Sequence, residues 1–121
     1  MKTLKIGIAT LEQYRERTIA IAKGQYKPRR GEPKIWFTSL ESFAKLLSAR
    51  NRALLKLIAQ TQPGSLQELA DKTGRAKSNL SRTLKTMERY GLVQFEEGHG
   101  RNRAPRVHYT DLSLDVPLQP L

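Results

Sequence analysis

The stretch PGSLQELADKTGRAKSNLSRTLKTMERYG contains two helical patterns that a single glycine separates. Ser65 and Glu68 have the spacing of a reciprocal capping box, which predicts a short helix over residues 66–73. Gly74 is expected to end this helix, and a longer helical pattern runs over residues 76–90. A short helix, a tight glycine turn and a longer helix together predict a helix-turn-helix.

Two short helices cannot bury a core alone, so the sequence requires further elements around them. The preceding stretch SARNRALLKLIAQ, residues 48–60, predicts a third helix with an apolar stripe of Leu54, Leu57 and Ile58. After the longer helix the apolar residues alternate, which predicts a β-hairpin with a charged loop, or wing, at residues 97–106. Three helices and a hairpin in this order predict a winged helix-turn-helix, in an α+β fold that is mainly α.

The helix predicted over residues 76–90 has two different faces on a helical wheel at about 100° per residue. One face is apolar and consists of Leu80, Leu84, Met87 and Gly91. The other face carries hydroxyls and positive charges, which come from Ser78, Arg82, Lys85 and Arg89, with Ser81 at the edge and Lys77 nearer the flank. A cationic helix face is often simply solvated. The second helix of a helix-turn-helix is, however, the element that enters the DNA major groove, so we expect this face to bind DNA.

The overall charge agrees with a polyanionic partner. The chain has 22 Lys and Arg residues against 11 Asp and Glu residues, which gives a net charge of +11. Such an excess favours nucleic acid as a partner first, an anionic membrane second and an acidic protein third. No apolar run approaches the ~20 residues that a membrane-spanning helix needs, and the basic start MKTLKIGIAT has no apolar core of a signal peptide. We therefore expect a cytoplasmic protein with no membrane partner.

The residue types on the cationic face suit contacts with duplex DNA. Arg82 can form a bidentate contact with guanine O6 and N7, or with a phosphate. Ser78 and Ser81 are short enough to let the helix approach the groove floor, and Asn79 is suited to adenine or to a phosphate. Arginines of the wing are expected to reach a flanking minor groove, with a solvated turn as the alternative. The predicted DNA-binding residues are Arg75, Lys77, Ser78, Asn79, Ser81, Arg82, Lys85, Arg101, Asn102, Arg103 and Arg106.

The run SLQELADKTGRAKSNLSRTLKTMERYGLV resembles the winged helix-turn-helix of MarR-like regulators, in particular through the pattern S-N-L-S-R-x-L-K-x-M-E-x-x-G-L-V. The resemblance covers residues 51–109, about half of the chain. It implies DNA binding as a dimer, with Ser78, Asn79, Ser81, Arg82 and Lys85 at the groove and Arg101 or Arg103 in the wing. The chain lacks the long terminal helices through which large MarR-type proteins dimerise, and it looks more like small stand-alone regulators, some of which resemble antitoxins.

Residues 1–37 are predicted to form an N-terminal extension, and residues 38–121 the winged helix-turn-helix domain. Within the extension, LKIGI at residues 4–8 predicts a strand and residues 11–23 a helix, whereas residues 24–34 read as an irregular basic linker. KIWFT predicts another strand, and LESFAKLLS a helix. We expect the extension to be an arm for dimerisation or for partner binding.

The leading interpretation is a sequence-specific double-stranded DNA-binding transcriptional regulator, acting as a dimeric repressor. The strand at 4–8, the helix at 11–23 and the C-terminal segment LSLDVPL would build a homodimer. The alternative is an antitoxin that neutralises a partner toxin while it autoregulates its operon, with exposed Tyr14, Tyr26 and Trp36 forming the grip. RNA binding is a third class, which the absence of stacking aromatics on the cationic face disfavours.

An enzyme is not expected, and neither is a cofactor. The sequence has no nucleophile–base pair and no glycine-rich phosphate loop, so no catalytic residues are assigned. With zero cysteines, a disulfide framework and a thiolate metal site are both excluded. His99 and His108 are too far apart to indicate a metal site, and Glu96 and Glu97 are expected to pair with neighbouring arginines.

Overall fold

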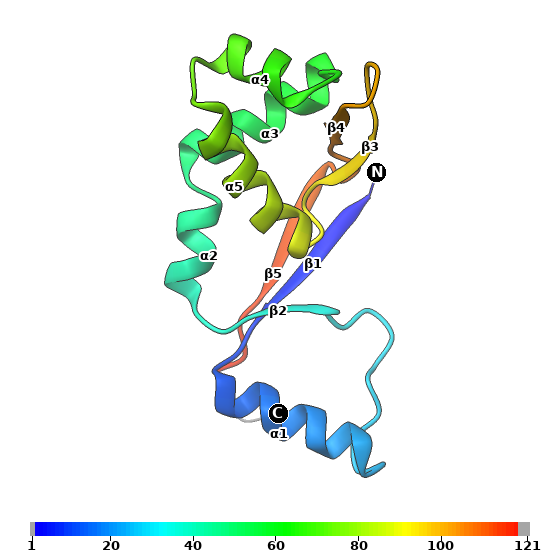
Figure 1. Ribbon diagram of the computed structural model, residues 1–121. Coiled ribbons are helices and arrows are strands. Elements are labelled where there is room, and N and C mark those ends of the chain that lie inside the picture. Colours follow the sequence, from blue (N-terminus) through cyan, green and yellow to red (C-terminus); the bar gives the residue numbers. More distant parts are fainter. Residues whose placement is uncertain (1, 119–121) are drawn as a thin grey trace. The chain divides into compact units, whose positions relative to one another are not determined.

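The computed structural model describes residues 2–118, and Figure 1 shows their helices and strands. These residues form five helices and five strands, which confirms the α+β class with mainly α content. They divide into two compact units: unit 1 contains residue 2 and residues 46–110, and unit 2 contains residues 3–45 and 111–118. Unit 2 is therefore discontinuous in sequence, because unit 1 is inserted between its second helix and its last strand.

This division differs from the expected one, which ended the N-terminal extension at residue 37. The segment that follows residue 37 packs with the extension, since Phe43 lies edge-on against Phe37 with ring centroids 5.2 Å apart. The segment at residues 111–115 also belongs with the extension, because it pairs with the first strand. The last part of the expected domain, residues 119–121, lies outside the described residues.

Unit 2 is built around a three-stranded sheet in which all strands are parallel. β1 (Thr3–Ile8) lies in the centre, between β2 (Ile35–Phe37) and β5 (Asp111–Asp115). α1 (Leu11–Ala22) connects β1 to β2, and α2 (Leu40–Leu46) follows β2. The predicted helix at 11–23 and strand at 4–8 thus agree with the structure to within one residue. Because β1 has a strand neighbour on both sides within its own chain, it cannot pair with a second copy, which corrects the expected role of this strand in a dimer.

Alternation along β1 separates the two faces of the sheet. Leu4, Ile6 and Ile8 are buried on one face. Gly7 lies on the other face, and its register partner is Trp36 of β2. The indole of Trp36 occupies the space in which a Cβ at position 7 would lie, so only glycine fits here without a rearrangement.

Unit 1 consists of three helices and a hairpin, in the predicted order. The helices are α3 (Ala49–Thr61), α4 (Leu66–Thr73) and α5 (Lys77–Arg89). Ser48 caps α3 and Ser65 caps α4, while Gly74 ends α4 in the left-handed conformation that glycine adopts without strain. The fully buried core side chains come from all three helices and the hairpin: Ile58, Leu69, Leu80, Leu84, Met87, Val93 and Pro105.

The hairpin differs in part from the expected one. β3 (Gln94–Glu97) pairs antiparallel with β4 (Arg103–Arg106), so the connecting loop is residues 98–102 and not the whole of residues 97–106. Val107, His108 and Tyr109 follow the end of β4, so the alternation of apolar residues after α5 extends beyond the paired strands. Alternation predicted the strand type correctly, but it does not fix where pairing starts and ends.

Substituting Gly7 by alanine should destabilise the protein, because the added methyl group would overlap the Trp36 ring. Overpacking of this kind costs about 1–3 kcal/mol, which urea unfolding followed by Trp36 fluorescence would measure. Thr3→Ala is the matched control, because Thr3 is an exposed residue of the same strand. If both variants unfold at the same urea concentration as the wild type, the close approach of Trp36 to Gly7 is contradicted.

Candidate nucleic-acid interface

α5 shows the two faces that its sequence predicts. Leu80, Leu84 and Met87 are completely buried against the rest of unit 1. The opposite side and its flanks are open to solvent, and the exposed residues of α5 are Lys77, Ser78, Asn79, Arg82, Lys85, Glu88 and Arg89. Arg82 and Lys85, the centre of this side, form no side-chain hydrogen bond or ion pair with residues 2–118. No acidic residue lies in the first turn of α5, and no side chain caps it.

A groove runs between the cationic side of α5 and the hairpin. Its volume is about 310 Å³, and its lining includes Lys77, Ser81 and Lys85 from the helix and Arg101 from the hairpin loop. The one acidic residue in the lining is Glu88, which lies 3.9 Å from Arg103. The guanidinium of Arg103 also lies over the Phe95 ring, 5.2 Å from its centroid. The groove is therefore a positively charged surface whose single acid already has a partner.

Arg75 and Asn79 contact each other, so neither is fully available to a ligand. The Arg75 guanidinium donates to Oδ1 of Asn79 at 2.9 and 3.1 Å, and to Oδ1 of Asn51 at 3.2 Å. Burial, and next the nearby Arg50, lower the pKa of Arg75. Arg75 thus ties α3 to α5. Bidentate recognition of adenine needs the Asn oxygen as an acceptor, and Arg75 occupies that oxygen of Asn79.

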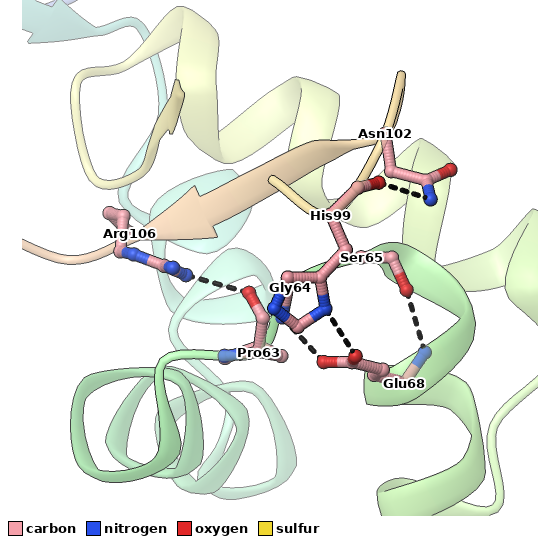
Figure 2. A network of polar contacts seen from close by, with 7 residues as sticks. All are labelled: Pro63, Gly64, Ser65, Glu68, His99, Asn102 and Arg106. Atoms are coloured by element: carbon pink, nitrogen blue, oxygen red, sulfur yellow. Dashed lines mark hydrogen bonds and ion pairs between the residues drawn. The ribbon is translucent and has the colours of Figure 1, made fainter. Parts of the chain in front are cut away.

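The hairpin loop is fastened to the start of α4, as Figure 2 shows. Nδ1 of His99 lies 2.8 Å from Oε1 of Glu68, and the His99 backbone N–H donates to the Gly64 carbonyl at 3.1 Å. The other carboxylate oxygen of Glu68 accepts from the Gly64 N–H, and these two hydrogen bonds lower the pKa of Glu68, the Gly64 bond most. The His99 ring fills the space beside Gly64 in which a Cβ would lie. We call His99, Glu68 and Gly64 the wing brace.

The wing brace corrects one predicted detail of the α4 start. The carboxylate of Glu68 was expected to accept from the N–H of Ser65, as in a reciprocal capping box. It accepts from Gly64 instead, one residue earlier, while the Ser65 hydroxyl accepts from the Glu68 N–H at 3.1 Å. The shift leaves the second carboxylate oxygen directed at His99.

Two further predicted DNA-binding residues have structural partners. Arg106 was predicted to contact DNA, but its side chain is only 16% exposed. It pairs with Glu96 at 2.9 Å and donates to the Pro63 carbonyl at 2.7 Å, so these partners correct the expectation of a free arginine. The pairing expected for Glu96 is thereby confirmed. Asn102 donates from its side chain and its backbone to the His99 carbonyl, at 2.8 and 3.2 Å, and so shapes the loop.

The predicted site residues thus fall into two groups. Those at the surface of unit 1 with no partner among the described residues are Lys77, Ser78, Ser81, Arg82, Lys85 and Arg101. Those that have partners within unit 1 are Arg75, Asn79, Asn102, Arg103 and Arg106. The wing brace was not predicted from the sequence, although the glycines in PG at 63–64 and in GHG at 98–100 indicate tight backbone approaches. Within residues 2–118 no group of three or more His, Asp or Glu side chains is placed to hold a metal ion.

Comparison with known proteins identifies the segment that contains this surface. A model of the HVO_A0114 family matches residues 46–114, which is more than half of the chain. The chain belongs to the HVO_A0114 family. The matched segment begins at residue 46, where the continuous part of unit 1 begins, and every residue of the predicted site lies within it. No curated protein and no solved structure matches this HVO_A0114 member significantly, so the resemblance to MarR-like regulators stays a prediction. In the part that the structure describes, no helix has the length and apolar content to cross a bilayer.

Substituting His99 by alanine should loosen the hairpin loop, because the imidazole is the side chain that links the loop to Glu68 of α4. Hydrogen–deuterium exchange of the amides at residues 98–102 should become at least several-fold faster, while exchange in α5 stays unchanged. His108→Ala is the control, since His108 is an exposed histidine outside the brace. Equal exchange at residues 98–102 in the wild type and both variants would show that the imidazole does not order the loop.

Proposed function

We propose that this protein is a sequence-specific double-stranded DNA-binding regulator of transcription, in which unit 1 works as a winged helix-turn-helix. The observation that carries the proposal is the surface of α5. Its apolar side is buried in the core, and its cationic side is exposed to solvent. An α-helix fits the major groove of B-form DNA, and an arginine at its centre is the commonest reader of guanine.

The groove between α5 and the hairpin supports the same proposal. Arg101 extends the positive surface from the helix to the hairpin loop, and the wing brace holds that loop in place. A loop held in this way contacts the DNA backbone at a smaller entropic cost than a mobile loop does. Repression is the simplest form of regulation for such a protein, because a bound molecule covers its own site.

We also propose that the protein binds DNA as a homodimer, with α1 of two copies in contact. No side chain of α1 is buried, and two of its apolar residues, Leu11 and Ile19, are 51% and 53% exposed. The helix carries both acids and arginines, Glu12, Arg15 and Glu16 among them, so a two-fold related copy can pair Arg15 with a glutamate of its partner. Two α5 helices about one DNA turn apart would then read an inverted repeat.

The decisive experiment is selection of bound fragments from a random duplex DNA pool, with a single-stranded RNA pool alongside. Enrichment of one duplex motif supports the proposal, and enrichment of RNA alone overturns it. On the selected site, Arg82→Ala should weaken binding by about 1–3 kcal/mol and relax the preference at one base position. Fluorescence anisotropy across a panel of sites measures both effects.

Arg82→Lys is the matched control, because lysine keeps the charge and lacks the planar fork. We expect this variant to bind unrelated duplexes as the wild type does and to lose the base preference. If all three proteins discriminate among sites equally, Arg82 does not read a base.

Substituting both Leu11 and Ile19 by glutamate should separate the dimer, because the change places like charges in the apolar contact. Light scattering should give the mass of one chain for this variant and of two chains for the wild type. Thr18→Glu, an exposed position on the same helix, controls for added charge. A wild-type protein with the mass of one chain, both alone and on its DNA site, would exclude the dimer.

A further inference from the structure

The segment between α1 and β2 carries an unusual concentration of positive charge. Residues 23–34, which we call the basic loop, contain one acid, Glu32, and five cations: Lys23, Lys27, Arg29, Arg30 and Lys34. All five cationic residues are exposed. None of their side chains forms a hydrogen bond or ion pair with the described residues 2–118. The basic loop also lies outside the segment that matches the family model.

The single acid of the basic loop does not compensate these charges, because its partners lie within unit 2. The Glu32 carboxylate pairs with Arg17 of α1 at 3.0 Å and accepts a hydrogen bond from the Tyr26 hydroxyl. These contacts, the Tyr26 hydrogen bond most, hold the pKa of Glu32 below its ordinary value, so it is ionised. Its charge is already matched by Arg17. The five exposed cations therefore have no counter-charge in the loop itself.

The basic loop is fastened to the sheet and is not a loose linker. The Trp36 indole N–H donates to the Pro33 carbonyl at 3.1 Å, and the Lys5 ammonium donates to the Gly31 carbonyl at 2.8 Å. The Arg17 guanidinium lies 5.2 Å from the centroid of the Trp36 ring and 5.9 Å from that of Tyr26. Tyr26 and Trp36 are consequently half-buried, which corrects the expectation that they are exposed as a grip for a toxin.

Fixing several like charges close together costs free energy in the isolated protein, because they repel each other. A linker that only spans the distance between a helix and a strand gains nothing from such an arrangement. A surface that binds a polyanion does gain, because the backbone that carries the cations is already held in place when the ligand arrives and less entropy is lost. The main sequence-independent contact that DNA offers is its phosphate backbone.

We propose that the basic loop is a second phosphate-binding surface, which grips the backbone of the same DNA duplex that α5 reads. The inference rests on the proposed function and adds a second contact to it. The chain passes between the two units three times, after residues 2, 45 and 110, so the loop is tethered to the DNA once unit 1 has bound. Tethering raises the effective concentration of the loop at the duplex and strengthens binding to every sequence alike.

The test is a salt titration of duplex binding by the full-length protein. The loop variant carries Lys27→Ala, Arg29→Ala and Arg30→Ala together. The control variant removes the same charge at three exposed positions elsewhere, with Lys45→Ala, Arg52→Ala and Lys56→Ala. Circular dichroism and thermal melting establish that both variants are folded. Fluorescence anisotropy then gives the dissociation constant on the selected site and on an unrelated duplex, between about 50 and 200 mM salt.

We expect the slope of log affinity against log salt to fall by about 0.9 for each phosphate that the variant no longer neutralises, up to about 3 for the loop variant. Affinity should fall by a similar factor on both duplexes, since phosphates carry no sequence information. The control variant should keep a slope close to that of the wild type, because surface charges more than about 10 Å from the DNA are screened. Hydroxyl-radical footprinting should show that the loop variant loses protection at equivalent positions in both half-sites.

Three outcomes would overturn the inference, and they are distinguishable. If the wild type binds no duplex, the proposed function fails and the inference fails with it. If the wild type binds a duplex and the two variants change the slope equally, only the inference fails, and the basic loop contributes net charge alone. If the loop variant keeps its DNA slope but loses binding to phosphatidylserine vesicles, the loop is a membrane contact and the inference again fails alone.

Discussion

The burial of Leu80, Leu84 and Met87 is the interaction on which the rest of unit 1 depends. These side chains have no exposed surface, and burying each one contributes about 1.5–3 kcal/mol. Their spacing fixes the rotation of α5 about its own axis, and Arg82 and Lys85 are therefore exposed to solvent. The chemistry of the outer side of α5 therefore follows from the packing of its inner side.

The core fixes the orientation of α5, and the wing brace fixes the position of the hairpin loop. The loop at residues 98–102 has no apolar side chain to bury, so packing cannot position it. Polar contacts position it instead: His99 reaches Glu68, and both residues meet at Gly64. Polar and cation–π contacts also hold a loop in unit 2, where Arg17, Glu32 and Trp36 fasten the basic loop. In each case the contacts leave nearby cations exposed.

Periodicity and capping residues were enough to predict most elements of the fold. Ser65 and Gly74 bound α4 as expected, because caps act over only three or four residues. The pairing of β1 with β5 could not be predicted in this way, since more than 100 residues separate the partners and neither strand indicates its neighbour. The same reason explains why the contact of Arg106 with Pro63 was not predicted. Its charge suggested DNA, but its partner Pro63 lies 43 residues away in the sequence, and only the fold brings the two together.

The central position of β1 also constrains how the molecule comes to be folded. Thr3 aligns with Asp111, so the sheet cannot close until the segment from residue 3 to residue 115 has left the ribosome. Residues 46–110, in contrast, emerge as one continuous stretch with mostly short-range contacts, and such stretches fold early. Until β5 arrives, one edge of β1 stays without its partner, and an unpaired strand edge of this kind can pair with another chain.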